Sequence, residues 1–521
     1  MSLNDDDTYQ KAIRLKTTES IRRASTKNIL ISVCVAAATY YSLTLIAKQF
    51  GGSQGSDAYF FLTSLSILAS GIIGSLLGTV FLPTFINLLE KGDKSVADHF
   101  ASSIFSWCFL IVSAVALPIG VWNEKFFLSI SRFDSSQISQ MQPVLKYFSV
   151  ILLFSLITEF FRIMALSLGK FSIAALTGIF PPLFLIIFLL FFQKKLLEEA
   201  LVASLLGAKI TALIILVAVV WKKGIRITLS FRKDPHTFRF VRTSGPYWFA
   251  NVVTNSATFF CDYMASGLGL GVVTSLAYAQ RIFLLPLTVF LHPLVEISRT
   301  KFAQFQSHSD STSLNSYYNN LMRFSLYFSV PLSALYIVFS EEIISAMFQG
   351  GAFQAENVLI AASCLNMYAW TIPLASVFMI NGRACESYQR LLWPSIFGSI
   401  GNILAIIATY VLVSKLGFIG IPLAKLVVDL IYFLPFGFIA FNLFGGVPQY
   451  FKISQSFGAS LFSALVAASI FLFMNVGHEY TGVAPALNTV IIKILYFFSV
   501  YFLTLLVISS KVRILAKEIW R

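Results

Sequence analysis

Long apolar stretches separated by short polar connections run along almost the whole chain. Each is close to the roughly 20 residues that an α-helix needs to cross about 30 Å of hydrocarbon. The stretches predict an all-α polytopic membrane protein of about 14 transmembrane helices, at residues 29–47, 58–88, 101–122, 146–169, 171–192, 197–221, 246–266, 271–298, 318–340, 356–381, 391–414, 417–443, 456–476 and 485–509. The stretch at 58–88 is too long for one straight crossing, so it is predicted to tilt or to turn near Pro83.

A long basic connection at residues 222–245 divides the predicted helices into two sets of six. The first set covers residues 29–221 and follows a polar cytoplasmic segment at 1–28. The second set covers residues 246–443, and residues 444–521 add two helices and a cytoplasmic tail.

The two sets resemble each other at the start of their second helix. A Gly-rich turn leads into Ala58-Tyr59 in the first set and into Ala277-Tyr278 in the second. Internal duplication is typical of transporters. The pattern therefore predicts two pseudo-symmetric six-helix lobes plus two C-terminal helices.

Composition supports a membrane location. The 521 residues are 57% hydrophobic and only 12% charged, with a mean hydropathy of +0.78, whereas soluble domains are about a quarter charged. The net charge of +14 does not indicate a nucleic-acid partner, because the basic residues lie in short connections between apolar stretches.

The basic residues also predict an orientation. They concentrate in every second connection, while the loops at 341–355 and 477–484 contain neither Lys nor Arg. By the positive-inside rule, both termini are predicted to be cytoplasmic.

The sequence offers little for enzyme chemistry. Its five cysteines and five histidines are scattered without metal-ligand or disulfide spacing, so no metal and no cofactor are predicted. The longest external stretch, at 123–145, has only Glu124 and Asp134 as acids.

Ionisable residues inside the predicted helices are the most informative feature, because each costs at least about 2.5–3.5 kcal/mol to insert. They are Glu159, Arg162, Lys209, Asp262, Arg281, Glu296, Lys425, Asp429 and Lys493. Two pairs have helical spacing and can neutralise themselves, Glu159 with Arg162 and Lys425 with Asp429. Lys493 is predicted to extend its ammonium toward the membrane interface.

Arg281 has no acidic neighbour at helical spacing. Two interpretations stay open: it faces water or an anionic substrate, or it pairs with Asp262 or another carboxylate on a different helix. An arginine suits phosphate because its planar guanidinium can donate two parallel hydrogen bonds. Lys209 also lacks a local partner and is predicted as a second candidate for substrate binding.

Several motifs resemble the MurJ/MviN family of lipid II flippases, within the superfamily of multidrug, oligosaccharidyl-lipid and polysaccharide exporters. The resemblance covers most of the chain. Its motifs are Phe50-Gly51 with Asp57-Ala58-Tyr59-Phe60, Leu82-Pro83, Tyr278-Ala279-Gln280-Arg281 with Leu285-Pro286, and Met347-Phe348-Gln349-Gly350-Gly351-Ala352-Phe353.

The resemblance implies a flippase of the bacterial inner membrane. Its substrate would be a lipid II-like, undecaprenyl pyrophosphate-linked cell-wall precursor, moved from the inner to the outer leaflet by alternating access of the two lobes. Its lipid tail would lie near the last two helices. By the same resemblance, Arg281, Asp57 and Lys48 match substrate-binding positions, Lys48 standing where the family has an arginine. Asn402 matches an asparagine associated with a sodium site in some members.

The chain departs from the family pattern in its first two helices. The family's Arg-Asp pair falls near Ser42 and Leu43, and its second-helix arginines fall near Ser70 and Gly71. Other interpretations therefore stay open: a flippase for another undecaprenyl-linked polysaccharide unit, a drug or cation exporter of the same superfamily, a membrane enzyme of polysaccharide assembly, or a scaffold that has lost transport.

Overall fold

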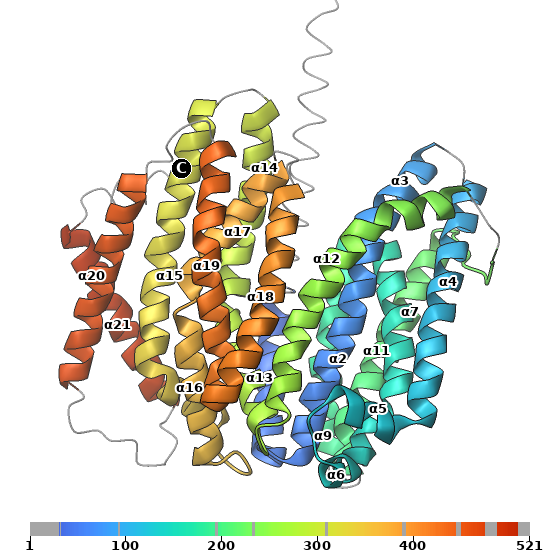
Figure 1. Ribbon diagram of the computed structural model, residues 1–521, viewed down its shortest axis with the longest axis horizontal. Coiled ribbons are helices and arrows are strands. Elements are labelled where there is room, and N and C mark those ends of the chain that lie inside the picture. Colours follow the sequence, from blue (N-terminus) through green and yellow to red (C-terminus); the bar gives the residue numbers. More distant parts are fainter. Residues whose placement is uncertain are drawn as a thin grey trace, which may run out of the picture. The chain divides into compact units, whose positions relative to one another are not determined.

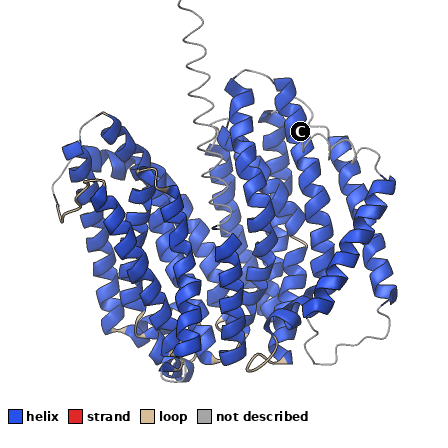
Figure 2. Ribbon diagram, turned by 180° about the vertical axis from the view of Figure 1, so that it is seen from behind, coloured by secondary structure: helices blue, strands red, loops and turns tan. Residues whose placement is uncertain are grey.

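The described part of the chain is almost entirely helical. The computed structural model describes residues 31, 33–91, 94–192, 196–231, 235–307, 311–387, 392–443, 450–474 and 487–508. Over these residues, helices are joined by short turns and loops (Figure 2), and an isolated bridge between Gly350 and Phe353 is the sole β-type pairing. The predicted all-α fold is confirmed. The predicted cytoplasmic segment at 1–28 and the tail beyond residue 508 lie outside the described residues.

Fewer helices meet the length and hydropathy needed to cross a membrane than the sequence predicts. Among the described residues, 10 helices are long and apolar enough to cross a membrane, or up to 11 if one bent pair counts as a single span. The protein is therefore a polytopic membrane protein, while the count of about 14 is not confirmed. Helices at residues 33–50 and in α12 (Pro235–Ala265) coincide with the first and seventh predicted spans but are not among those 10.

The chain forms two compact units. The N-terminal unit contains the described residues up to Leu45, Leu62–Phe127 and Ile138–Val252. The C-terminal unit contains Ile46–Phe61, Leu128–Gln137 and the described residues from Val253 onward. Two short segments from the first half of the sequence therefore belong to the C-terminal unit.

The N-terminal unit is a bundle in which α7 (Phe148–Ser167) packs against both α4 (Lys94–Val121) and α11 (Glu199–Lys222), as can be followed in Figure 1. The other helices with residues in this unit are the helix at residues 33–50, α2 (Gln54–Leu76), η1 (Leu77–Phe81), α3 (Leu82–Glu90), α5 (Asn123–Ile130), α6 (Ser135–Leu145), α8 (Phe171–Leu176), η2 (Thr177–Ile179), α9 (Phe180–Phe191) and the first part of α12.

Aromatic packing joins the helices of the N-terminal unit. The ring of Phe81 stacks on those of Phe85 and Phe100 with centroid separations of 5.4 Å, and the ring of Phe160 lies tilted at 5.6 Å. All four side chains are fully buried. Because aromatic side chains bury large apolar areas and their pairs add further attraction, this stack links η1 and α3 to α4 and α7.

The second membrane-crossing helix of each half contains a π turn before a proline. In the first half, α2, η1 and α3 run continuously from Gln54 to Glu90, so the helix does not turn at Pro83 as one prediction held. The N–H of Leu82 bonds to the carbonyl of Leu77, five residues back. The N–H of His292 bonds in the same way to Leu287 at the end of η3 (Leu287–Leu291), two residues before Pro293. Since proline has no N–H to donate, the π turn shifts the ladder of hydrogen bonds past it.

The C-terminal unit is built around the long helix α15 (Ser311–Phe348), which packs against α14, α16, α17, α20 and α21. Its helices are the end of α12, α13 (Val272–Pro286), η3, α14 (His292–Ser307), α15, α16 (Ala355–Ala369), α17 (Ile372–Ser387), α18 (Leu392–Leu416), η4 (Gly417–Ile419), α19 (Gly420–Leu443), α20 (Tyr450–Met474) and α21 (Leu487–Ile508).

Two polar contacts attach α21 to α15. The hydroxyl of the fully buried Tyr501 donates to the carbonyl of Tyr327 at 2.8 Å and lies 2.8 Å from Ser460 Oγ on α20. The Lys493 ammonium contacts both carboxylate oxygens of Glu342, at 2.9 and 3.0 Å. The extension of Lys493 toward the membrane interface stays a prediction, and within the protein a carboxylate from α15 neutralises its ammonium.

Two predicted segments differ in detail. The basic connection at 222–245 is shorter than predicted, because α12 already begins at Pro235, a residue that fits the first turn of a helix. The span predicted at 356–381 is broken into α16 and α17, which meet at 49°. Thr371 Oγ1 donates to the carbonyl of Tyr368, and Ser333 Oγ donates to that of Ala369, so the carbonyls freed at the break are paired.

The buried hydroxyl of Tyr501 provides a test of how α21 is held. We expect Tyr501→Phe to lower the free energy of unfolding by about 1 kcal/mol or more, because the carbonyl of Tyr327 loses a donor in an apolar setting. The measurement is thermal unfolding of the purified protein in detergent. The matched control is Tyr410→Phe on α18, where the tyrosine is 62% exposed. Equal unfolding midpoints for the two variants would show that the hydroxyl does not fasten α21.

Candidate functional site

Three sequence motifs that lie far apart in the chain meet around Tyr278 in the C-terminal unit. Its ring stacks on Phe348 with the centroids 4.4 Å apart, and Phe60 and Phe353 approach it edge-on at 5.3 and 5.2 Å. Tyr278 is fully buried. We call these residues, with Gly51, Asp57 and Gly351, the motif cluster. Its aromatic members hold the start of α2, α13 and the end of α15 together.

Asp57 closes the N-terminus of α13. Its carboxylate accepts hydrogen bonds from the backbone N–H of Gly271 at 2.7 Å and of Thr274 at 2.9 Å, and from the Thr274 hydroxyl at 2.6 Å. The first N–H groups of a helix have no partner within the helix, and the helix dipole favours an anion there. Asp57 is 1% exposed, so its carboxylate acts here as a cap supplied by a distant segment.

Two glycines allow the backbones of the motif cluster to touch. Gly51 and Gly351 both have positive φ, at 57° and 61°. A Cβ on Gly51 would collide with the carbonyl of Ala352, and one on Gly351 would collide with the carbonyl of Lys48. The N–H of Ala352 donates to that same Lys48 carbonyl at 3.0 Å. Only glycine fits both the conformation and the space.

Two of the predicted substrate-binding residues, Lys48 and Asp57, lie in different environments. Lys48 joins the motif cluster through its backbone, while its side chain is exposed. Asp57 is buried and uses its acceptors within the protein. Contact of either residue with substrate stays a prediction.

Arg281 lies one turn beyond Tyr278 on α13 and is half-buried. Its neighbour Gln280 donates from its side-chain amide to the hydroxyl of Tyr368 on α16 at 3.2 Å. This contact and the Asp57 cap together fix the rotation of α13, and thereby the direction in which Arg281 leaves the helix.

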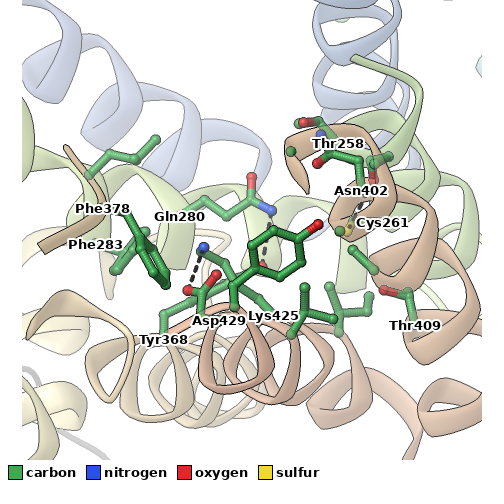
Figure 3. Close-up of a pocket in the computed structure, with 18 residues that line it drawn as sticks. Thr258, Cys261, Gln280, Phe283, Tyr368, Phe378, Asn402, Thr409, Lys425 and Asp429 are labelled. Carbon is green, nitrogen blue, oxygen red and sulfur yellow. Dashed lines mark hydrogen bonds and ion pairs between the residues drawn. The ribbon is translucent and has the colours of Figure 1, made fainter. Parts of the chain in front are cut away.

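A cavity of about 490 Å³ lies within the C-terminal unit, with lining residues from α12, α13 and α16 to α19. Figure 3 shows the ion pair between Lys425 and Asp429, 2.8 Å apart, near the Gln280 amide. The predicted pairing of these two residues along one helix is confirmed. Both residues of the pair line the cavity, and the Lys425 side chain, at 41% exposed, is more open than that of Asp429, at 13%.

Asn402 lines the same cavity from α18, beside Thr258 and Cys261 in the view of Figure 3. Its side-chain amide donates to the hydroxyl of Thr254 at 2.9 Å. An amide oxygen and hydroxyl oxygens are ligand types that a hard cation accepts. The ion-binding role of Asn402 stays a prediction.

The N-terminal unit holds the remaining candidate, Lys209. It is half-buried midway along α11, and its charge interacts with those of Glu159 and Arg162 on α7. Glu159 and Arg162 form the predicted pair, with Nε to Oε2 at 2.8 Å and Nη2 to Oε1 at 2.6 Å. Sequence reasoning found the pair and the lysine separately but did not connect them, because helical spacing carries no information on contacts between helices.

The arrangement of the helices matches solved membrane transporters. The structure of "Lipid II flippase MurJ, inward closed conformation" matches with a TM-score of 0.78 and 19% sequence identity, over 95% of this chain and 100% of that one. An inward-facing multidrug resistance MATE family transporter of the MOP superfamily matches with a TM-score of 0.65 and 13% identity, over 80% and 98%. The fold is thus one shared by helical membrane transporters.

The family follows from sequence comparison. The family model described as "Lipid II flippase MurJ" matches residues 46–490. The probable lipid II flippase MurJ of Rickettsia prowazekii (strain Madrid E) is 23% identical, over 69% of this chain and 73% of that protein. The one of Aquifex aeolicus (strain VF5) is 22% identical, over 81% and 82%. The chain belongs to the lipid II flippase MurJ family, and it is a transporter rather than an enzyme.

The cap on α13 is testable through stability. We expect Asp57→Ala to lower the free energy of unfolding by about 2–4 kcal/mol, because a helix cap is lost and buried N–H groups are left without acceptors. The measurement is thermal unfolding of the purified protein. Glu356→Ala serves as the control, since Glu356 is an exposed acid of the same unit. A variant as stable as the control would contradict the capping role.

Proposed function

We propose that this protein is a flippase that moves a lipid pyrophosphate-linked cell-wall precursor of the lipid II type from the inner to the outer leaflet by alternating access. The observation that carries the proposal is the family match over residues 46–490, which includes the whole motif cluster and Arg281. The likeness to MATE transporters concerns the fold alone. The exporter and enzyme interpretations have no comparable support.

Arg281 is the residue proposed to hold the pyrophosphate. Its guanidinium can donate two parallel hydrogen bonds to phosphate oxygens, which a lysine cannot match. The support is its position on α13, a helix whose N-terminus is capped by Asp57 and whose next residue toward that end, Gln280, is bonded to Tyr368. Such fixed supports keep a binding side chain in one orientation. We propose lesser contributions from Lys48 and Lys209.

The lipid tail is proposed to lie against the last two helices. A cavity of about 350 Å³ between α20 and α21 is lined by Phe462, Val466, Leu503, Thr504, Val507 and Ile508. Its lining is almost wholly apolar, and several of these side chains are more than half exposed, among them Phe462 at 58% and Val507 at 83%. A prenyl chain is chemically suited to such a groove because it offers only hydrocarbon.

Complementation tests the function and the role of Arg281 together. In a strain depleted of its own lipid II flippase, we expect the wild-type chain to restore growth and to prevent accumulation of lipid-linked precursors. Arg281→Ala should fail at an equal level in the membrane, and Arg281→Lys should restore growth partially. Arg226→Ala, which changes an exposed arginine, should behave as wild type.

The results of complementation distinguish between the remaining interpretations. Growth with Arg281→Ala equal to wild type would contradict the anion-binding role of Arg281. Failure of the wild-type chain at a normal membrane level would exclude lipid II itself and favour another undecaprenyl-linked polysaccharide unit.

The proposed orientation places both termini in the cytoplasm of a bacterium, with the chain in its inner membrane. We expect a fluorescent protein fused to the C-terminus to fluoresce and alkaline phosphatase fused there to be inactive, since the latter folds only outside the cytoplasm. The reverse pattern would refute the orientation derived from the basic loops.

A further inference from the structure

Three charged side chains gather between α7 and α11 of the N-terminal unit. Glu159 and Arg162 come from α7, and Lys209 comes from α11, which packs against α7. The Arg162 guanidinium contacts both oxygens of the Glu159 carboxylate. Lys209 interacts electrostatically with both of them. We call these three residues the N-terminal triad.

The triad has a net charge of one positive unit. Glu159 supplies one negative charge against two positive ones, and Arg162 holds it in a bidentate pair. Within the described residues, the Lys209 ammonium makes no hydrogen bond and no ion pair shorter than 4.0 Å. An ammonium in this position costs several kcal/mol unless an anion or water compensates for it.

Lys209 does not belong to the most exposed surface of its helix. That surface is formed by Ile210, Ile214 and Trp221, which are 40%, 64% and 63% exposed. The carbonyl of Lys209 instead accepts a hydrogen bond from the Thr158 hydroxyl of α7, at 3.4 Å. Lys209 is thus part of the contact between α11 and α7, beside the ion pair.

The backbone of α2 at Gly74 also lies against the triad. A Cβ at this position would lie 2.5 Å from Glu159 Oε1, the same oxygen that Arg162 Nη2 contacts. One turn further along the helix, a Cβ on Gly78 would meet only Ile163, at 4.0 Å. The absence of a side chain at Gly74 therefore leaves room for the carboxylate in its present position.

We propose that the N-terminal triad is a phosphate subsite in which Glu159 is a resident counterion that the phosphate of the substrate displaces from Arg162. This inference rests on the proposed function, because it assigns a second contact to the same class of lipid pyrophosphate. Arg162 uses two of its five N–H donors on Glu159, and all three donors of Lys209 are available. A dianionic phosphate accepts such donors readily.

The counterion gives the subsite a means of release. While the subsite is empty, Glu159 keeps the Arg162 guanidinium neutralised and in position. A bound phosphate replaces Glu159 as the acceptor of the Arg162 hydrogen bonds. The Glu159 carboxylate then competes with that phosphate for the same guanidinium. Glu159 therefore weakens binding and speeds dissociation, which a carrier needs in order to turn over.

Opposite effects on affinity test the proposal. The full-length protein in nanodiscs of zwitterionic lipid is titrated with undecaprenyl pyrophosphate, with undecaprenol as the uncharged control and inorganic pyrophosphate as the source without a lipid. We expect Lys209→Gln to weaken binding of undecaprenyl pyrophosphate roughly ten- to hundredfold, and Lys209→Arg to preserve it. Glu159→Gln should tighten binding and slow dissociation. Binding of undecaprenol should not change.

The two glycines of α2 provide a matched pair. Gly74→Ala should shift the Glu159 carboxylate off Arg162 and tighten binding in the same direction as Glu159→Gln, though less. Gly78→Ala should leave affinity unchanged, since its new methyl group has space. A misfolded variant cannot bind more tightly, so tightening separates this effect from a loss of structure.

Weaker or unchanged binding in Glu159→Gln, or unchanged binding in Lys209→Gln, overturns the subsite. If Arg281→Ala abolishes binding while the triad variants do not alter it, the subsite fails and the proposed function stands. If the wild-type chain does not bind undecaprenyl pyrophosphate at all, the proposed function fails with it. Binding of inorganic pyrophosphate with the same variant pattern would support the subsite and show that the lipid is not needed for recognition.

Discussion

Keeping ionised side chains inside apolar helices is the constraint on which much of this architecture depends. A charge without a partner is costly in hydrocarbon, and the described part of the protein meets that cost with contacts that also hold helices in place. The Glu342–Lys493 pair fastens α21 to α15, and the Lys425–Asp429 pair places a compensated charge at the wall of a cavity. Asp57 has no cation as its partner among the described residues and is stabilised by the N-terminus of α13.

The sequence predicts well whatever depends on neighbours along one helix. The helical fold and the pairs Glu159–Arg162 and Lys425–Asp429 follow from apolar length and from spacings of three and four residues. Contacts between helices lie beyond that reasoning. Lys493 and Glu342 are 151 positions apart, and nothing in either segment indicates that their helices present these side chains to each other. The π turns of η1 and η3 were also missed, because a proline signals a disturbed helix but not its form.

The candidate sites show the same division. Resemblance indicated that the segments around Gly51, Tyr278 and Gly351 matter, and the structure explains the residue types: close backbone contact requires the glycines, and one buried ring organises the aromatic residues. Charge analysis singled out Lys209, yet only the packing of α11 on α7 connects it to Glu159 and Arg162. The two compact units also do not coincide with the two sets of helices on either side of the basic connection at 222–245. Segments 46–61 and 128–137 precede that connection but belong to the C-terminal unit.

The cap on α13 has a consequence for biosynthesis. Asp57 precedes Gly271 by 214 residues. At typical rates of translation, roughly 10–40 s pass between the synthesis of the carboxylate and that of its first donor. Throughout this interval the segment at 46–61 exists without the helix whose N–H groups its carboxylate accepts from. A nascent chain that ends before α13 therefore lacks the backbone donors of this cap, and the contact can form only after more than half of the 521 residues have been made.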